Sequence, residues 1–174
     1  VDFPRRKKYN EKNCFCDKGK TWSSQCGEEG KNMAKQYFLG TDIGTSATKT
    51  VLTDLTGRIV AAETATYSVL TPHPLWAEQW PDVWYDAVIK TIRAVVEKSG
   101  IEPKAIAALT ISGLYGGSGI PCDGEMKPLR PCLIWMDKRA QAESDWVRDT
   151  VGEKHLFDVT ANYIDPYYGY TKIL

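Results

Sequence analysis

The sequence predicts an α/β domain in which a mixed sheet is flanked by helices. Two observations lead to this class. Several short segments rich in β-branched residues precede one long segment with helical periodicity, and further apolar segments of strand length follow it. Strands on both sides of a helix in the chain favour a sheet that combines antiparallel and parallel neighbours.

The first strands are expected over Tyr37–Leu39, Thr48–Asp54 and Ile59–Ser68. The second alternates along its length and is rich in the β-branched residues that favour strands. A turn over 55–58 separates the second strand from the third, with Gly57 available for a positive φ. Because the connections are short, the three strands should form an antiparallel meander.

A helix is expected over residues 81–99. Pro81 suits the first helical position, and Gly100 suits the stop. Apolar side chains recur at helical spacing and should face the core. They are Trp84, Ala87, Val88, Ile92, Val95 and Val96.

After this helix, the continuous apolar run Ala105–Ser112 predicts a strand buried on both faces. Shorter strands are expected over Ile120–Cys122 and Leu133–Trp135. A second helix is expected over about 138–150, with Asp137 as its N-terminal cap.

The net formal charge is zero, with 22 Lys plus Arg and 22 Asp plus Glu. This balance argues against nucleic-acid binding. No apolar run approaches the roughly 18 residues that a membrane-spanning helix needs, and the first residues lack the apolar core of a signal peptide. We therefore expect a cytoplasmic protein with no nucleic-acid and no membrane partner.

Residues 1–32 differ in composition from the rest of the chain. They have an excess of basic residues and hold the cysteines Cys14, Cys16 and Cys26. The cysteine spacing matches no usual zinc pattern, and the segment has no histidine. Gly27–Gly30 must be encoded by purine-rich codons that resemble a ribosome-binding sequence shortly before Met33. We expect residues 1–32 to be a non-domain leader from upstream translation, and residues 33–174 to form the domain.

The usual signatures of nucleotide sites and hydrolases are missing from the sequence. It has neither a G-x-x-x-x-G-K-[ST] loop nor a proper G-x-G-x-x-G. The glycine-dense segment Gly113–Gly119 lacks the spacing of a nucleophile elbow. The two histidines, His73 and His155, have no plausible nucleophile beside them, so a hydrolase triad is not expected.

The clearest chemical signal is a polar turn at the end of the first strand. Gly44 lets the backbone bend closely, so that successive N–H groups can point at phosphate oxygens. Thr45 and Ser46 add hydroxyl donors, and Lys49 adds positive charge. Asp42, at the strand end, can hold Mg²⁺ through water. An ordinary polar hairpin is the alternative, because the motif is short.

Residues 36–174 resemble the N-terminal part of the FGGY family of sugar kinases, and xylulokinases in particular. The landmarks are Asp42–Lys49, Pro72–Gln79, Leu109–Gly113, Leu133–Arg139 and Ile164–Tyr167 with Thr171 and Lys172. The resemblance implies an actin-like, ribonuclease H-like ATPase fold, of which the chain holds an incomplete N-terminal domain. It also implies ATP and Mg²⁺ as cofactors and a sugar or polyol as the substrate.

The same resemblance implies roles for individual residues. Asp42, Thr45 and Ser46 are expected to face the ATP phosphates and the metal. The residues expected at the substrate are Tyr115, Trp135, Asp137, Arg139 and Tyr167. The aromatic residues among them suit the apolar C–H faces of a sugar, while the charged pair would line or brace the same cleft.

The sequence departs from the family pattern in two places. Xylulokinases carry Gln-Met-His where this chain has Leu114–Gly116, so a xylulose-like pentulose is only the preferred substrate among several sugars. The family's general base is an aspartate in a Gly-Asp-Asn or Gly-Asp-Gln stretch, which this sequence lacks and which is expected beyond Leu174. We therefore expect an inactive fragment of a kinase that, when complete, is compatible with a homodimer. The alternatives are a non-catalytic remnant, a sugar-binding module, or another actin-like nucleotide-switch ATPase.

Overall fold

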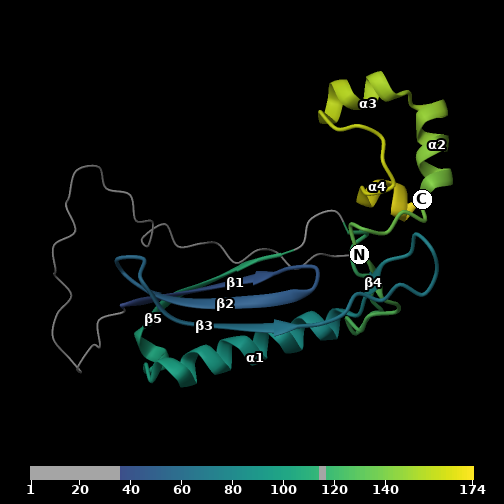
Figure 1. Ribbon diagram of the computed structural model, residues 1–174. Coiled ribbons are helices and arrows are strands. Elements are labelled where there is room, and N and C mark those ends of the chain that lie inside the picture. Colours follow the sequence, from purple (N-terminus) through teal and green to yellow (C-terminus); the bar gives the residue numbers. More distant parts are fainter. Residues whose placement is uncertain (1–35, 114–116) are drawn as a thin grey trace, which may run out of the picture. The chain divides into compact units, whose positions relative to one another are not determined.

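The computed structural model describes residues 36–113 and 117–174, and the leader predicted over 1–32 lies outside them. Its main strands are β1 (Tyr37–Ile43), β2 (Ala47–Asp54), β3 (Ile59–Thr66) and β5 (Ile106–Ser112). They form a four-stranded sheet in the order β3–β2–β1–β5 (Figure 1). β1 pairs antiparallel with β2, and β2 with β3, whereas β5 lies parallel to β1. The predicted mixed sheet and its antiparallel meander are confirmed.

The turn between β2 and β3 is organised by one carboxylate. Oδ1 of Asp54 accepts the backbone N–H of Thr56 at 2.9 Å and that of Arg58 at 3.1 Å. The hydrogen bond from the Thr56 hydroxyl is the largest of the interactions that lower the pKa of Asp54 to about 2. Gly57 has a φ of 85°, which confirms the predicted role of this glycine.

Helix α1 (Pro81–Ser99) runs along one side of the sheet (Figure 1). Its bounds are those predicted, and it ends at Gly100 with a φ of 64°. Val95 packs with Leu39 of β1 and Leu52 of β2 in a buried cluster. Burying these aliphatic side chains stabilises each by about 1.5–3 kcal/mol relative to exposure, so this cluster is what fixes α1 on the sheet.

A row of buried threonine hydroxyls also joins α1 to the sheet. Oγ1 of Thr50 lies 2.9 Å from Oγ1 of Thr41 and 2.7 Å from Oγ1 of Thr91. The Thr91 hydroxyl also donates to the carbonyl of Ala87 at 2.8 Å. All three threonines are buried, and these bonds satisfy groups that burial would otherwise destabilise. The helical periodicity did not include Thr91 in the core-facing stripe.

The prediction that the apolar run 105–112 is buried on both faces was wrong for the described residues. Within them, β5 is the edge strand of the sheet, because β1 is its single neighbour. Leu109 and Ile111 are accordingly 53% and 50% exposed. A strand's apolar composition shows that it should be covered, but it does not show which segment covers it.

The segments after β5 contain several corrections. The strand predicted at 120–122 is only an isolated bridge between Cys122 and Pro128. The strand predicted at 133–135 is instead β6 (Cys132–Leu133), which pairs with β4 (Glu78–Gln79). Trp135 therefore follows a strand rather than lying in one.

The helical segments also differ from the prediction. The second long helix, α2 (Gln141–Thr150), begins three residues later than expected, and Ala140 rather than Asp137 is at its N-cap. Two further helices were not predicted, α3 (Glu153–Thr160) and α4 (Gly169–Ile173). A short 3₁₀ turn, η2 (Pro103–Ala105), precedes β5. Over the part of the chain that the structure describes, none of the helices has the length and apolar character to cross a membrane.

Candidate functional site

Residues 42–49, which we call the phosphate hairpin, join β1 to β2 through a very tight turn. The N–H of Gly44 donates to the carbonyl of Ala47 at 2.9 Å. A Cβ at position 44 would lie 3.0 Å from that same carbonyl oxygen, so a side chain there would force the turn open. The sequence prediction that Gly44 allows a close bend fits this geometry.

Tyr67, just after β3, forms hydrogen bonds with the phosphate hairpin. Its hydroxyl donates to the carbonyl of Gly44 at 2.7 Å and lies 3.0 Å from Oγ1 of Thr48. Its backbone N–H donates to the carbonyl of Ser46 at 2.9 Å. Tyr67 lies in the strand expected over Ile59–Ser68, but no contact with the turn was expected from it. In the structure it directly follows β3, which pairs with β2.

Asp42 and Lys49 are cross-strand partners at the base of the phosphate hairpin. Both are exposed, and the side-chain alternation of β1 places Asp42 on the face opposite to the buried Thr41 and hence away from α1. Together with Ser112 of β5 they line a groove of about 400 Å³. A carboxylate, an ammonium group and the hydroxyls of Thr45 and Ser46 thus gather at one end of the sheet.

Trp135 and Tyr167 form a second feature, which we call the aromatic wall. Their ring centroids lie 6.0 Å apart in an edge-to-face arrangement. Trp135 is 39% exposed. Its indole Nε1–H donates to Oγ1 of Thr45 at 2.9 Å, across 90 residues of sequence. The aromatic wall and the phosphate hairpin are therefore in direct contact.

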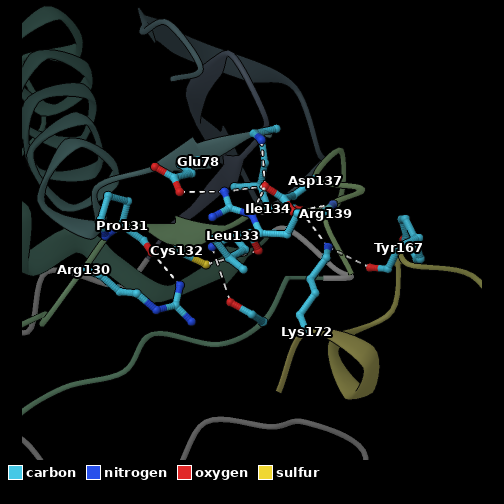
Figure 2. A network of polar contacts seen from close by, with 12 residues as sticks. Glu78, Arg130, Pro131, Cys132, Leu133, Ile134, Asp137, Arg139, Tyr167 and Lys172 are labelled. Atoms are coloured by element: carbon cyan, nitrogen blue, oxygen red, sulfur yellow. Dashed lines mark hydrogen bonds and ion pairs between the residues drawn. The ribbon is translucent and has the colours of Figure 1, made fainter. Parts of the chain in front are cut away.

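Beside the aromatic wall, Asp137 lies at the centre of a network of charged hydrogen bonds (Figure 2). Its carboxylate is fully buried and accepts the backbone N–H of Ala77 at 2.8 Å. It also accepts Nε and Nη2 of Arg139, at 2.9 Å and 2.7 Å. Nη2 of Arg139 donates in addition to Glu78 at 2.6 Å, and the guanidinium carbon lies 3.5 Å from the centre of the Trp76 ring. The hydrogen bonds of Asp137 and Arg139 described above are thus with other groups of the protein, and the predicted role of the pair at a substrate cleft stays a prediction.

The electrostatics of this network favour the ionised carboxylate. Burial raises the pKa of Asp137, but the hydrogen bonds from Arg139 and from the N–H of Ala77 together outweigh burial and hold the pKa below its ordinary value. Since the carboxylate is ionised and paired at neutral pH, it fixes the Arg139 side chain. It also fixes the backbone that leads from Trp135 to α2.

Lys172 of α4 is the other buried charge of this region (Figure 2). Its ammonium donates to the carbonyl of Ile134 at 2.8 Å and to the carbonyl of Tyr167 at 3.0 Å. Burial is the main reason why the pKa of Lys172 lies below its ordinary value. Lys172 thus contacts the backbone at both members of the aromatic wall, at Ile134 directly before Trp135 and at Tyr167 itself.

Lys138 and Asp165 add a partly exposed pair next to Tyr167. Nζ of Lys138 donates to Oδ1 of Asp165 at 2.6 Å, and the backbone N–H of Tyr167 donates to the same oxygen at 2.7 Å. Burial raises the pKa of Asp165, but these hydrogen bonds together lower it below its ordinary value.

The structure brings together most of the residues that the sequence analysis singled out. The hairpin set is Asp42, Gly44, Thr45, Ser46 and Lys49, and Trp135 joins it through Thr45. Tyr115 lies outside the described residues, so its predicted contact with substrate stays a prediction. Tyr67 and Lys172 were not assigned a role. Their contacts bridge positions distant in sequence, and the only available signal for Lys172 was its place in the Thr171-Lys172 landmark.

Residues 37–174 match the family described as the FGGY family of carbohydrate kinases, N-terminal domain. The chain is 31% identical over 137 residues to the xylulose kinase of Escherichia coli K12, and 32% identical over 137 residues to the gluconokinase of Bacillus subtilis. Each alignment covers 79% of this chain, but only 27% of the first relative and 26% of the second.

Among solved structures, a xyloylose kinase from Brucella ovis matches with a TM-score of 0.72 at 31% identity. The match covers 79% of this chain and 28% of that chain. Together with the family match, it confirms the α/β fold that the sequence predicts and the actin-like fold that the family resemblance implies. The chain spans about a quarter of the length of the relatives that it matches.

Proposed function

The chain belongs to the FGGY family of carbohydrate kinases, and from this premise we propose that the complete protein phosphorylates a sugar or polyol. The phosphoryl donor is ATP with Mg²⁺, and a xylulose-like pentulose is the preferred acceptor. The observation that carries the proposal is the hydrogen bond from Trp135 to Thr45, because it joins an aromatic surface suited to a sugar with a turn suited to phosphates.

The phosphate hairpin has the groups that a magnesium–phosphate complex needs. The Thr45 and Ser46 hydroxyls can donate to phosphate oxygens, and Lys49 adds a positive charge. Mg²⁺ is commonly held by one or two carboxylates together with phosphates and water, and Asp42 supplies one exposed carboxylate here. The described residues contain no cluster of three or more potential metal ligands, so Asp42 is proposed as a single ligand acting through water. When bound, Mg²⁺–ATP supplies the phosphoryl group that is transferred.

The protein's own contribution is mainly to position the reactants, as in phosphoryl transfer generally. The aromatic wall would hold the apolar face of the sugar, with Trp135 contributing its ring because its N–H is already used. Asp137 and Arg139 would fix the loop that follows Trp135, and their direct contact with sugar stays a prediction. The proton of the attacking hydroxyl must go to a base.

The 174-residue sequence offers no Gly-Asp-Asn or Gly-Asp-Gln stretch for that base. We therefore propose that the 174-residue chain does not catalyse the reaction alone.

A substrate screen on the full-length gene product tests this proposal. ADP formation would be followed with D-xylulose, gluconate, glycerol and a buffer blank. We expect ADP formation that depends on one of these acceptors, with D-xylulose the best of them. ATP hydrolysis that is equal with and without every acceptor would contradict the proposal and would favour one of the alternatives, an actin-like nucleotide-switch ATPase.

A further inference from the structure

Thr45 contacts the aromatic wall although it belongs to the phosphate hairpin. An indole N–H can only donate a hydrogen bond, so the Thr45 oxygen must be the acceptor. A threonine hydroxyl has one hydrogen and two lone pairs, and accepting from Trp135 uses one lone pair and leaves the hydrogen. Among the residues that the structure describes, Trp135 is the only hydrogen-bond partner of this hydroxyl.

We propose that Thr45 is a shared positioning residue, whose hydroxyl orients the Trp135 indole by accepting from it and donates its own hydrogen to a phosphate oxygen. The proposal rests on the proposed function, which supplies the two ligands. A donor that also accepts becomes a better donor, because the two hydrogen bonds polarise each other. Phosphate bound at Thr45 would thus strengthen its bond to Trp135, and a sugar that orders Trp135 would tighten phosphate binding.

Both ends of this contact are anchored, as such coupling requires. On the hairpin side, the Tyr67 hydroxyl holds the carbonyl of Gly44 at 2.7 Å. On the wall side, Lys172 holds the carbonyl of Ile134, directly before Trp135, at 2.8 Å. A shift of the Thr45 hydroxyl is therefore passed to the indole rather than absorbed by a loose backbone. Binding at either site must affect the other by the same factor, because coupling free energies are reciprocal.

Calorimetric titration of the full-length protein with D-xylulose, in the absence and presence of saturating Mg²⁺–tripolyphosphate, measures the coupling. We expect tripolyphosphate to tighten sugar binding about two- to tenfold, the range that one net hydrogen bond allows. Thr45→Val keeps the shape of the side chain but loses the hydroxyl, and should bring the ratio of the two dissociation constants to about one. Thr45→Ser should restore it. Thr64→Val, at an exposed threonine of β3, is the matched control and should keep the wild-type ratio.

The indole N–H resonance of Trp135 in the ¹⁵N-labelled protein gives a direct readout of the contact with Thr45. It should shift when tripolyphosphate is added without sugar, and it should not shift in Thr45→Val. A Thr45→Val chain that binds each ligand more weakly but keeps the wild-type ratio would overturn the proposal, because Thr45 would then be merely structural. An unshifted indole in the wild-type chain would overturn it too. If the full-length protein binds tripolyphosphate but none of the tested sugars, the result counts against the proposed function, and the coupling falls with it.

Discussion

Replacing Asp137 with alanine should destabilise the chain strongly, although the residue lies in a loop between β6 and α2. The carboxylate is fully buried and accepts from the backbone N–H of Ala77 and from the guanidinium of Arg139. Removing the carboxylate leaves the buried N–H of Ala77 without an acceptor and the Arg139 guanidinium without its main partner. The loss of one member of a buried ion pair costs about 3–5 kcal/mol.

We expect the lower end of that range, about 3 kcal/mol, for Asp137→Ala. Arg139 is partly exposed and keeps its hydrogen bond to Glu78, so its charge is not left wholly uncompensated. With a denaturant dependence of about 2 kcal/mol per molar urea, the unfolding midpoint should fall by about 1.5 M. Circular dichroism during urea titration at pH 7 measures this shift.

The matched control is Asp158→Ala, which breaks the exposed pair between Asp158 and Lys154 in α3. It should cost less than about 0.5 kcal/mol, because solvent screens such pairs. The pH dependence gives a second check. The pKa of Asp137 is lowered in the folded chain, so its contribution to stability is present above the pKa of an unfolded aspartate and is lost as the pH falls through the lowered folded value. The difference between wild type and Asp137→Ala should therefore shrink in acid. Equal unfolding midpoints for Asp137→Ala and Asp158→Ala at pH 7 would refute the reasoning.

Three further predictions concern single side chains. Tyr67→Phe removes the hydroxyl that donates to the carbonyl of Gly44. The free energy of unfolding, measured by thermal unfolding, should fall by about 1 kcal/mol, and calorimetry should show a several-fold weaker binding of Mg²⁺–tripolyphosphate. Unchanged values for both would argue against this role of Tyr67. Lys172→Met leaves two carbonyls without their donor and should cost about 1–3 kcal/mol in urea unfolding at neutral pH. Folding lowers the pKa of Lys172. Between the lowered folded value and the ordinary value, the unfolded chain therefore binds one proton more than the folded chain. Wild-type stability should rise with pH in that window, and the Lys172→Met chain should lack this rise. Carbon-detected NMR titration should give Asp54 a pKa of about 2, and an ordinary aspartate value would show that its turn hydrogen bonds are not formed in solution.

The elements that the sequence predicted well depend on local signals. The meander of β1, β2 and β3 follows from β-branched residues and from the turn at Gly57. The bounds of α1 follow from Pro81 at its start and Gly100 at its end. In each case the physical cause lies within a few residues of the element, so a single sequence contains it.

The features that the sequence did not predict depend on distant partners. Asp137 has the residue type and position of a helix cap, but Ala77, 60 residues earlier, provides the N–H that it accepts. Likewise, 90 residues separate Trp135 from Thr45. The composition of β5 indicated burial on both faces, whereas its neighbours in space are set by the fold. The phosphate hairpin could be found as a motif, but its contact with the aromatic wall could not.

The central claim is that the phosphate hairpin and the aromatic wall are adjoining parts of one kinase site. A crystal structure of the full-length protein with D-xylulose and a non-hydrolysable ATP analogue tests it most directly. The account predicts phosphate oxygens within hydrogen-bonding distance of Thr45 and Ser46, and the sugar ring or chain packed against Trp135. A sugar bound elsewhere, with Trp135 remote from it, would contradict the account.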